Sequence, residues 1–359
     1  MGSTVACDEL AGRASRPRAI SQGIARRIWA GGAAALVLLA VAGAPAAQAA
    51  MSKQDRGSLL PQPTGQWASY LHGNERSGFN SAEQLITPVS APQLAQRWSY
   101  TTSQPISAQP IEANNLVYFG SWDGYERALT PSGHLVWSTY LGRTNAPSCG
   151  STVIGVASTP FVTQASPANL PTARSVLYVG GGDGQIYALD AHSGAVIWST
   201  RLGPSPATFI WSSPLVYNGS VYIGVSSLGD CPLVQGQLVQ LNATTGALQH
   251  TFAVVPTGCT GGGVWGSPAL DAHTGIIYFA TGNGNVCSTS ETYATALVAV
   301  RAAGLTLVSS WQIPPSQQVF DGDFGSTPTL FTATIGGVSR SLLGIVGKNG
   351  LYYAFDRTN

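Results

Sequence analysis

One short pattern repeats along most of this chain of 359 residues. Its clearest copy runs from Tyr178 to Trp198 and consists of an aromatic strand, an Asp-Gly turn, a Tyr-Ala-Leu-Asp strand, a Ser-Gly turn and a closing tryptophan. Related copies begin near Val117, Val221, Ile277 and Gly347. Apolar residues alternate with a period of two, as in strands, and Asp-Gly supplies the positive φ of a hairpin turn. Such a repeat predicts a series of similar β units that pack on one another.

A second marker recurs with the same period. A proline opens each unit, and in the last four units it follows a pair of small residues. These prolines are Pro110, Pro160, Pro214, Pro268 and Pro328, and successive ones are 50 to 60 residues apart. Each unit has room for three or four short strands, which favours an all-β fold, a β-propeller of four-stranded blades. A two-sheet sandwich is the alternative fold, but it does not account for the repeat.

Composition agrees with this fold and limits the function. Only 9% of residues are charged, whereas Gly (43) and Pro (22) are plentiful, as expected for short strands joined by tight loops. The net charge is +1, but the first 27 residues carry five arginines, and without that segment the chain has 12 basic and 14 acidic residues. Nucleic-acid binding needs a basic surplus to displace phosphate counterions, so we expect no nucleic-acid partner.

The N-terminus has the pattern of a signal peptide. Arg26-Arg27 precedes a largely apolar run, residues 28–42, and Ala47-Gln48-Ala49 forms an A-x-A cleavage pattern. The run is short for a membrane span, which takes about 20 apolar residues. We therefore predict a signal peptide over 1–49, a flexible lead-in over 50–66 and a propeller over 67–359. The mature chain is expected in the periplasm, cell wall or medium, without a membrane span; an uncleaved anchor is the alternative.

Four cysteines follow this leader. They are Cys149, Cys231, Cys259 and Cys287. In an oxidising compartment an even number predicts two disulfides, with three possible pairings. Four buried thiols are the alternative. No two of these cysteines have C-x-x-C spacing, which argues against a zinc site and against covalent haem.

The unit from Ala188 to Trp198, A-L-D-A-x-S-G-x-x-x-W, resembles the tryptophan-docking repeat of quinoprotein dehydrogenases. That family binds pyrroloquinoline quinone (PQQ) in an eight-bladed propeller, and the resemblance covers nearly all of 67–359. The scattered cysteines and the segment from Asp323 to Pro328 are closer to the polyvinyl-alcohol-dehydrogenase-like branch. We count five units, and the last copy stops at Asn359 before its tryptophan. The resemblance therefore implies about five of eight blades, a propeller truncated at its C-terminus.

The resemblance also implies a cofactor site. Trp265 lies in a glycine-rich loop and would stack on the planar quinone, while Asn283, 18 residues later, would bind a calcium ion. Asp230 occupies the position of the family's metal-binding Glu, and Ser227 would hydrogen-bond the carboxylates of the cofactor. A tryptophan of a blade core and ordinary polar turns are the alternative interpretation of these residues.

Two charged positions would complete the chemistry. Asp321 and Asp323 both fit the family's catalytic Asp, and we assign Asp321 as the general base that takes the alcohol proton. Lys348 matches the cation that contacts the quinone oxygens. Turn caps and a solvated lysine are the structural alternatives.

Two functions follow from this sequence. The first is an exported PQQ- and calcium-dependent dehydrogenase that oxidises a small or polymeric alcohol and passes electrons to an external acceptor. The second is a non-catalytic propeller that acts as a binding or assembly scaffold at the cell envelope. The family's adjacent Cys-Cys pair and the Arg that holds the PQQ carboxylates have no match here, which favours the second. A weaker third option is sugar or polymer binding at the cell surface.

Overall fold

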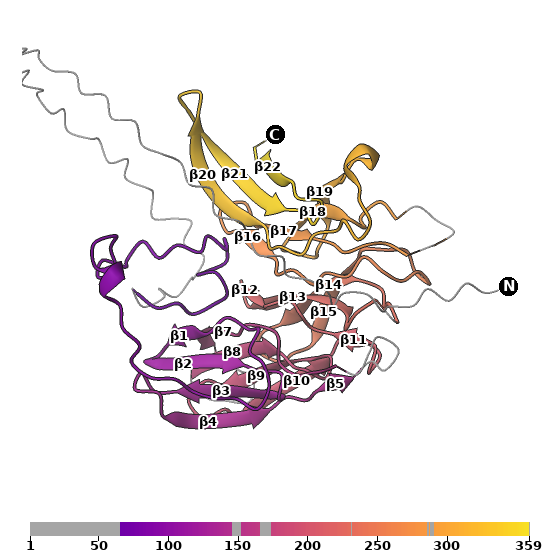
Figure 1. The fold of residues 1–359 in the computed structure, drawn as a ribbon. Coiled ribbons are helices and arrows are strands. Elements are labelled where there is room, and N and C mark those ends of the chain that lie inside the picture. Colours follow the sequence, from indigo (N-terminus) through magenta and orange to yellow (C-terminus); the bar gives the residue numbers. More distant parts are fainter. Residues whose placement is uncertain are drawn as a thin grey trace, which may run out of the picture. The chain divides into compact units, whose positions relative to one another are not determined.

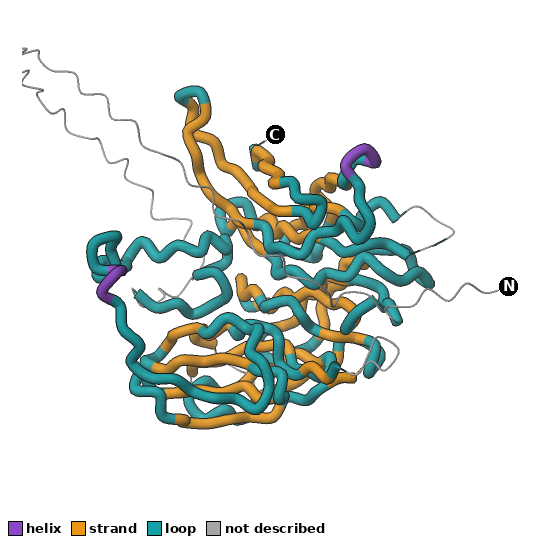
Figure 2. Tube along the Cα trace, in the orientation of Figure 1, coloured by secondary structure: helices purple, strands orange, loops and turns teal. Residues whose placement is uncertain are grey.

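The computed structural model describes residues 65–145, 152–165, 174–230, 232–285, 287 and 291–358. The predicted signal peptide, nearly all of the lead-in, Cys149 and Cys231 lie outside these ranges. Within them the chain is built of strands, and the helices are two 3-10 segments, η1 (Ala91–Gln93) and η3 (Pro315–Gln317) (Figure 2). None of the described helices is long and apolar enough to cross a membrane.

The strands form five antiparallel sheets that follow one another in chain order (Figure 1). The first contains β1 (Ile111–Ala113), β2 (Leu116–Gly120), β3 (Tyr125–Leu129) and β4 (Leu135–Tyr140), and the second contains β7 (Phe161–Ala165), β8 (Arg174–Gly180), β9 (Gln185–Asp190) and β10 (Val196–Arg201). The third contains β12 (Leu215–Tyr217), β13 (Ser220–Ser227), β14 (Gln237–Asn242) and β15 (Leu248–Ala253), with β11 (Thr208–Phe209) added to β13. The fourth contains β16 (Ala269–Asp271), β17 (Ile276–Ala280), β18 (Ala296–Arg301) and β19 (Leu307–Gln312), and the fifth contains β20 (Thr329–Ile335), β21 (Val338–Val346) and β22 (Tyr352–Asp356). A separate pair joins β5 (Thr144–Asn145) to β6 (Val153–Ile154).

These sheets confirm the predicted all-β propeller architecture with five units. Four sheets have at least four strands, and the described part of the fifth has three. The period-two pattern is explained by packing, because alternate residues of a middle strand contact different neighbours. In β8, Leu177 and Val179 belong to the apolar cluster shared with the first sheet, whereas Val176 and Tyr178 belong to the cluster shared with the third.

The tryptophan of the repeat is a contact between successive sheets. The indole Nε1 of Trp137 donates a hydrogen bond to the Ala191 carbonyl at 3.0 Å, and Trp198 donates to Ala243 in the same way. The ring of Trp137 lies against Gly194, where an added Cβ would be 2.6 Å from the indole. The glycine of one unit is therefore required by the tryptophan of the unit before it. The indole N–H of Trp98 likewise donates a hydrogen bond to the Pro131 carbonyl, although Trp98 lies outside the described strands.

The residue before each proline marker makes a second kind of contact between neighbouring sheets. The backbone N–H groups at these positions donate to the side chain of the equivalent residue in the next sheet. The bonds run from Gln109 to Thr159 Oγ1 (2.8 Å), from Thr159 to Ser213 Oγ (3.0 Å), from Ser213 to Ser267 Oγ (2.9 Å) and from Ser267 to Thr327 Oγ1 (3.1 Å). We call these four side chains the hydroxyl ladder. They explain why small hydroxylated residues precede the prolines.

A non-repeating segment, residues 67–76, contacts the first strand of all five sheets. Its backbone bonds join Trp67 to Glu112, Ala68 to Val162, Asn74 to Leu270 and Glu75 to Leu330, and the Asn74 side chain donates to the Val216 carbonyl. We call it the axial segment. Its last residue, Arg76, is fully buried.

One of the predicted disulfides is present. Cys259 and Cys287 are bonded, with 5.8 Å between their Cα atoms. The bond closes a segment that contains both Trp265 and Asn283. It thus links the two ends of the chain segment that supplies part of the candidate site.

Candidate functional site

All six residues predicted from the sequence line one cavity of about 250 Å³. Ser227 ends β13 and Asp230 follows it, Asn283 follows β17, and Lys348 follows β21. The other two precede the first strands of their sheets: Trp265 lies before β16 and Asp321 before β20. Residues far apart in the chain therefore meet because each unit places its turns at the same end of its sheet. The lining also includes Asp323, Trp211, Leu228 and Leu233.

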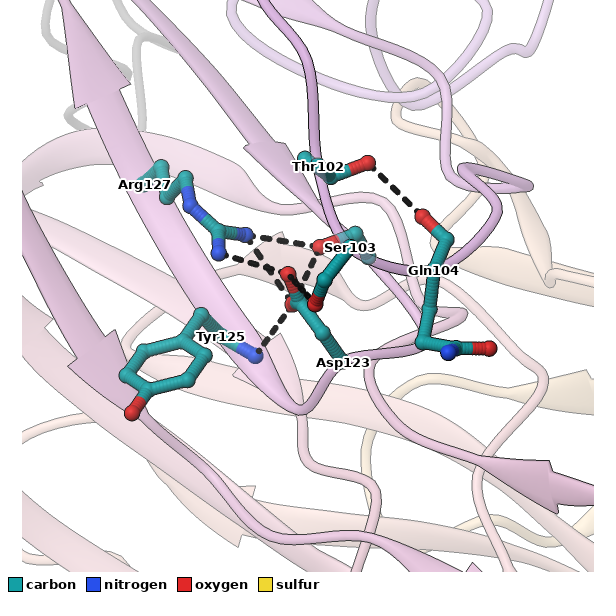
Figure 3. Close-up of polar contacts among 7 residues, drawn as sticks. Thr102, Ser103, Gln104, Asp123, Tyr125 and Arg127 are labelled. Atoms are coloured by element: carbon teal, nitrogen blue, oxygen red, sulfur yellow. Dashed lines mark hydrogen bonds and ion pairs between the residues drawn. The ribbon is translucent and has the colours of Figure 1, made fainter.

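The corresponding hairpin turn of the first sheet is closed by its own side chains. In the first sheet, Asp123 accepts two hydrogen bonds from the Arg127 guanidinium, at 2.7 and 3.1 Å (Figure 3). Ser121 and Ser103 also donate to this carboxylate. Burial raises the pKa of Asp123, but the bonds from Arg127 and Ser121 outweigh it and lower the pKa to about 2. This carboxylate is paired with an arginine of its own sheet and does not line the cavity.

A lysine joins two of the three aspartates that line the cavity. Lys348 Nζ lies 3.0 Å from Asp321 Oδ1 and 2.6 Å from Asp323 Oδ1. The side chain of Asp323 is 6% exposed, whereas that of Asp321 is 49% exposed. Burial raises the pKa of Asp323 despite the lysine. Burial lowers the pKa of Lys348, but its bonds to Asp323 and Asp321 prevail and raise it, so the ammonium stays charged.

Asp323 also fixes the other polar groups around it. Its Oδ2 accepts hydrogen bonds from the Trp265 indole N–H at 3.3 Å and from the Asn283 backbone N–H at 3.2 Å. Its carbonyl accepts the backbone N–H of Lys348 at 2.9 Å. Asp323 therefore holds together residues from the fourth and fifth sheets. By contrast Asp321, which adopts a left-handed backbone conformation with φ 51°, faces solvent.

The indole of Trp265 has space for a planar ligand. One part of the ring lies against Gly325, where a Cβ would be 2.6 Å from Trp265 Cη2, and the Lys348 ammonium lies 5.0 Å from the ring centroid. Gly263 and Gly282 also line the cavity, and a Cβ at Gly263 would meet Ser226 at 2.9 Å. An added Cβ at Gly263 or Gly325 would therefore be too close to a neighbouring side chain.

Oxygen atoms suited to a hard cation are present in the cavity. The Asn283 amide Nδ2 donates to Asp321 Oδ1 at 2.7 Å, which orients the amide and leaves its Oδ1 without a donor from the described residues. Asp230 adds a carboxylate to the lining. The Ser227 hydroxyl accepts the Val234 N–H at 2.8 Å and keeps its own hydrogen for a ligand. The described residues contain no group of three or more His, Cys, Asp or Glu arranged for a metal, so a bound ligand would have to complete the coordination.

Trp211 is a lining residue that the sequence interpretation did not assign. Its indole N–H donates to the carbonyls of Ser227 and Leu228, at 3.1 and 3.2 Å, and so fixes the loop that carries Ser227 and Asp230. The signal for it was present, because Trp211 and Trp265 each stand two residues before a Ser-Pro pair. They occupy the same position in successive units.

Comparison with known proteins agrees with this fold. The chain is 26% identical to the quinohemoprotein alcohol dehydrogenase ADH IIB of Pseudomonas putida, over 90% of the chain and 50% of that protein. It is 23% identical to a polyvinylalcohol dehydrogenase of a Pseudomonas species, over 61% of the chain and 36% of that protein. The structure of the quinohemoprotein alcohol dehydrogenase from Comamonas testosteroni shares the fold, with a TM-score of 0.65, 22% identity, and 82% of this chain and 48% of that chain covered.

The chain thus spans about half the length of the curated quinohemoprotein relatives that it matches. A family model, the β-propeller domain of PQQ-dependent glucose, ethanol and alcohol dehydrogenases, matches residues 67–359. That range includes all five sheets and the six site residues. The chain therefore belongs to the family of PQQ-type dehydrogenase β-propellers.

Proposed function

We propose that this chain supplies the cofactor-binding half of an exported quinoprotein that oxidises an alcohol. The observation that carries the proposal is the cavity itself, which brings together, from three sheets, the six residues assigned to the cofactor site by their resemblance to the family. Names of the relatives support an alcohol as substrate, since they include alcohol and polyvinylalcohol dehydrogenases.

The residues of the cavity fit PQQ and a calcium ion. The Trp265 indole would stack on the quinone, the Ser227 hydroxyl would donate to a carboxylate of the cofactor, and Lys348 would approach the quinone oxygens. Asp230 and Asn283 Oδ1 would bind Ca²⁺, with further oxygen ligands from the cofactor. When bound, the quinone supplies a two-electron acceptor.

The two aspartates would have different tasks. Asp321 is exposed to the cavity, and its Oδ1 accepts hydrogen bonds from Asn283 and Lys348. This accessible side chain would take the proton of the alcohol hydroxyl. Asp323 is buried and bonded to Trp265 and Asn283, so it would position the cofactor site rather than contact the alcohol.

Reconstitution tests this function. The purified chain is mixed with PQQ and CaCl₂, quinone binding is followed by absorbance and by quenching of tryptophan fluorescence, and dye reduction is measured with small alcohols and with polyvinyl alcohol. We expect a binding signal that needs Ca²⁺ and is lost in Trp265→Ala. The control is Trp122→Phe, because Trp122 does not line the cavity.

Two outcomes would reject parts of the proposal. If the wild-type chain binds no PQQ with Ca²⁺ present, the cofactor site is wrong and the scaffold function is favoured. If PQQ binds but no alcohol drives dye reduction, this chain binds the cofactor without catalysing the oxidation by itself.

A further inference from the structure

A second cavity, of about 180 Å³, shares Trp211 and Trp265 with the cofactor cavity. We call it the axial chamber, because Tyr70 of the axial segment contributes to its wall. The rest of its polar lining consists of the hydroxyl ladder, namely Thr159, Ser213, Ser267 and Thr327, together with Ser107. No residue of this lining is acidic or basic.

The hydroxyl ladder leaves four O–H donors uncommitted. Each hydroxyl oxygen accepts one backbone N–H from the preceding sheet, but none of the four donates its hydrogen to another described residue. Three of these residues are nearly inaccessible, since Thr159, Ser213 and Ser267 are 2%, 4% and 5% exposed. Buried O–H groups without an acceptor are costly, so the chamber favours an occupant that accepts hydrogen bonds.

A buried cation is linked to the hydroxyl ladder through backbone carbonyl groups. Arg76 is 0% exposed and donates to the carbonyls of Pro214 and Pro268, the residues that follow Ser213 and Ser267. Its third bond goes to the carbonyl of Tyr70, in the chamber wall. No described carboxylate lies within 4.0 Å of the guanidinium. Burial lowers the pKa of Arg76 to about 10, which still leaves it charged at neutral pH.

An uncompensated buried charge is unfavourable unless an opposite charge or strong dipoles stabilise it. Three carbonyl groups satisfy the directional bonds of Arg76, but they carry no net charge. A small anion in the axial chamber would supply that charge and would also accept the free O–H groups of the ladder. Water would satisfy the hydroxyl groups only.

We propose that the axial chamber binds one halide ion, chloride under physiological conditions, through hydroxyl groups of the ladder that include Thr159. The positive field of Arg76 selects an anion over water, and the chamber adds indole edges from Trp211 and Trp265. Ser107 and Gly325 are exposed at its margin, so ions have an opening to solvent. The chamber shares Trp211 and Trp265 with the cofactor cavity, but none of the proposed halide ligands is a proposed cofactor ligand.

Crystals of the full chain grown with sodium bromide in place of chloride test the location. Data collected at the bromine absorption edge should show an anomalous peak in the chamber, within hydrogen-bonding distance of the ladder hydroxyls. Density for water alone, or bromide only on the outer surface, would overturn the proposal.

A solution measurement tests the same claim independently. Thermal unfolding is followed in sodium chloride, sodium bromide and sodium gluconate at equal ionic strength, because gluconate is too large for the chamber. We expect a saturable rise in Tm of about 3 °C with either halide and none with gluconate.

Thr159→Val separates halide binding from a structural role of the ladder. The variant keeps the shape of the side chain but removes one O–H donor, so it should lower the Tm in all salts and should also shift the halide midpoint at least fivefold. The matched control is Thr334→Val, an exposed threonine on β20 without side-chain hydrogen bonds to described residues. An unchanged midpoint in Thr159→Val, or equal stabilisation by gluconate, would contradict the halide site.

Discussion

The Lys348 ammonium lies 2.6 Å from Oδ1 of the buried Asp323, and the other oxygen of this carboxylate holds the Trp265 indole N–H at 3.3 Å. One carboxylate thus fixes both the cation and the stacking ring of the cofactor cavity. The ring and the ammonium come from different sheets, so their relative position depends on Asp323.

Lys348→Met should damage the site and cost stability. It leaves the buried Asp323 without its cation, which we expect to lower the free energy of unfolding by about 1–3 kcal/mol and to raise the pKa of Asp323 further. Urea unfolding measures the stability, and tryptophan fluorescence with PQQ measures the affinity. Lys348→Arg is the control, since it keeps the charge; a Met variant as stable as the Arg variant would contradict the importance of the pair.

The two aspartates should respond differently to amidation. Asp321→Asn removes the proposed base, so the rate of alcohol oxidation should fall at least about a hundredfold while PQQ affinity changes little. Asp323→Asn should weaken PQQ binding first, because its amide cannot accept the Trp265 N–H with one atom and pair with the Lys348 ammonium through the other. Steady-state kinetics and binding titrations separate the two effects. The opposite pattern would assign the base to Asp323.

Glu126 predicts a pH dependence of stability that is separate from the cavity. The side chain is 0% exposed, neither carboxylate oxygen has a described hydrogen-bond partner, and burial raises its pKa well above the ordinary value. The folded state therefore binds this proton more tightly than the unfolded state, and its stabilising contribution is complete only below the ordinary pKa.

As the pH rises from the unfolded-state pKa of Glu126 to its raised folded-state pKa, the free energy of unfolding should fall. Glu126→Gln should abolish this fall and should be more stable than wild type at pH 8, by about 1–3 kcal/mol. Urea titrations at pH 4 and pH 8 measure both. Glu75→Gln, an exposed glutamate, is the control. Parallel pH profiles for wild type and Glu126→Gln would contradict the prediction.

The tryptophan contacts can be tested with two glycines of equal backbone conformation. Gly194 and Gly219 both have φ 72°, but an added Cβ at Gly194 would meet the Trp137 ring at 2.6 Å, whereas one at Gly219 has nothing within 4 Å. Alanine at either position carries the cost of positive φ, about 1 kcal/mol. Gly194→Ala should lose about 1–3 kcal/mol more, through displacement of the indole. Equal losses by urea unfolding would mean that docking on the turn adds nothing.

Much of the fold was predictable because its determinants recur. The proline marker and the tryptophan marker each correspond to a contact between neighbouring sheets, so one physical requirement appears several times in the sequence. The site residues were assigned from the resemblance to the family, and the fold brings all six to one cavity. Whether they bind PQQ and Ca²⁺ stays a prediction.

The features that the sequence did not reveal occur once in the chain and depend on contacts between residues far apart in sequence. Arg76 stands alone in a segment without periodicity, and its partners, the carbonyls of Pro214 and Pro268, are backbone groups that carry no side-chain signal. The sequence also did not show that Asp323 is buried and Asp321 is exposed. The two aspartates lie two residues apart in one loop, and only the contact with the neighbouring sheet distinguishes them.

The axial segment has a consequence for how the chain folds. Sheets that contact only their neighbours would be expected to form independently and to lose structure one at a time. Here Glu75 is hydrogen-bonded to Leu330 in the fifth sheet, and residues between Trp67 and Glu75 are hydrogen-bonded to each of the first four sheets. The set of bonds is therefore complete only when the fifth sheet is in place. Such long-range closure slows folding. It also couples the stability of the first sheet to that of the last, and the five units should therefore unfold in one cooperative transition.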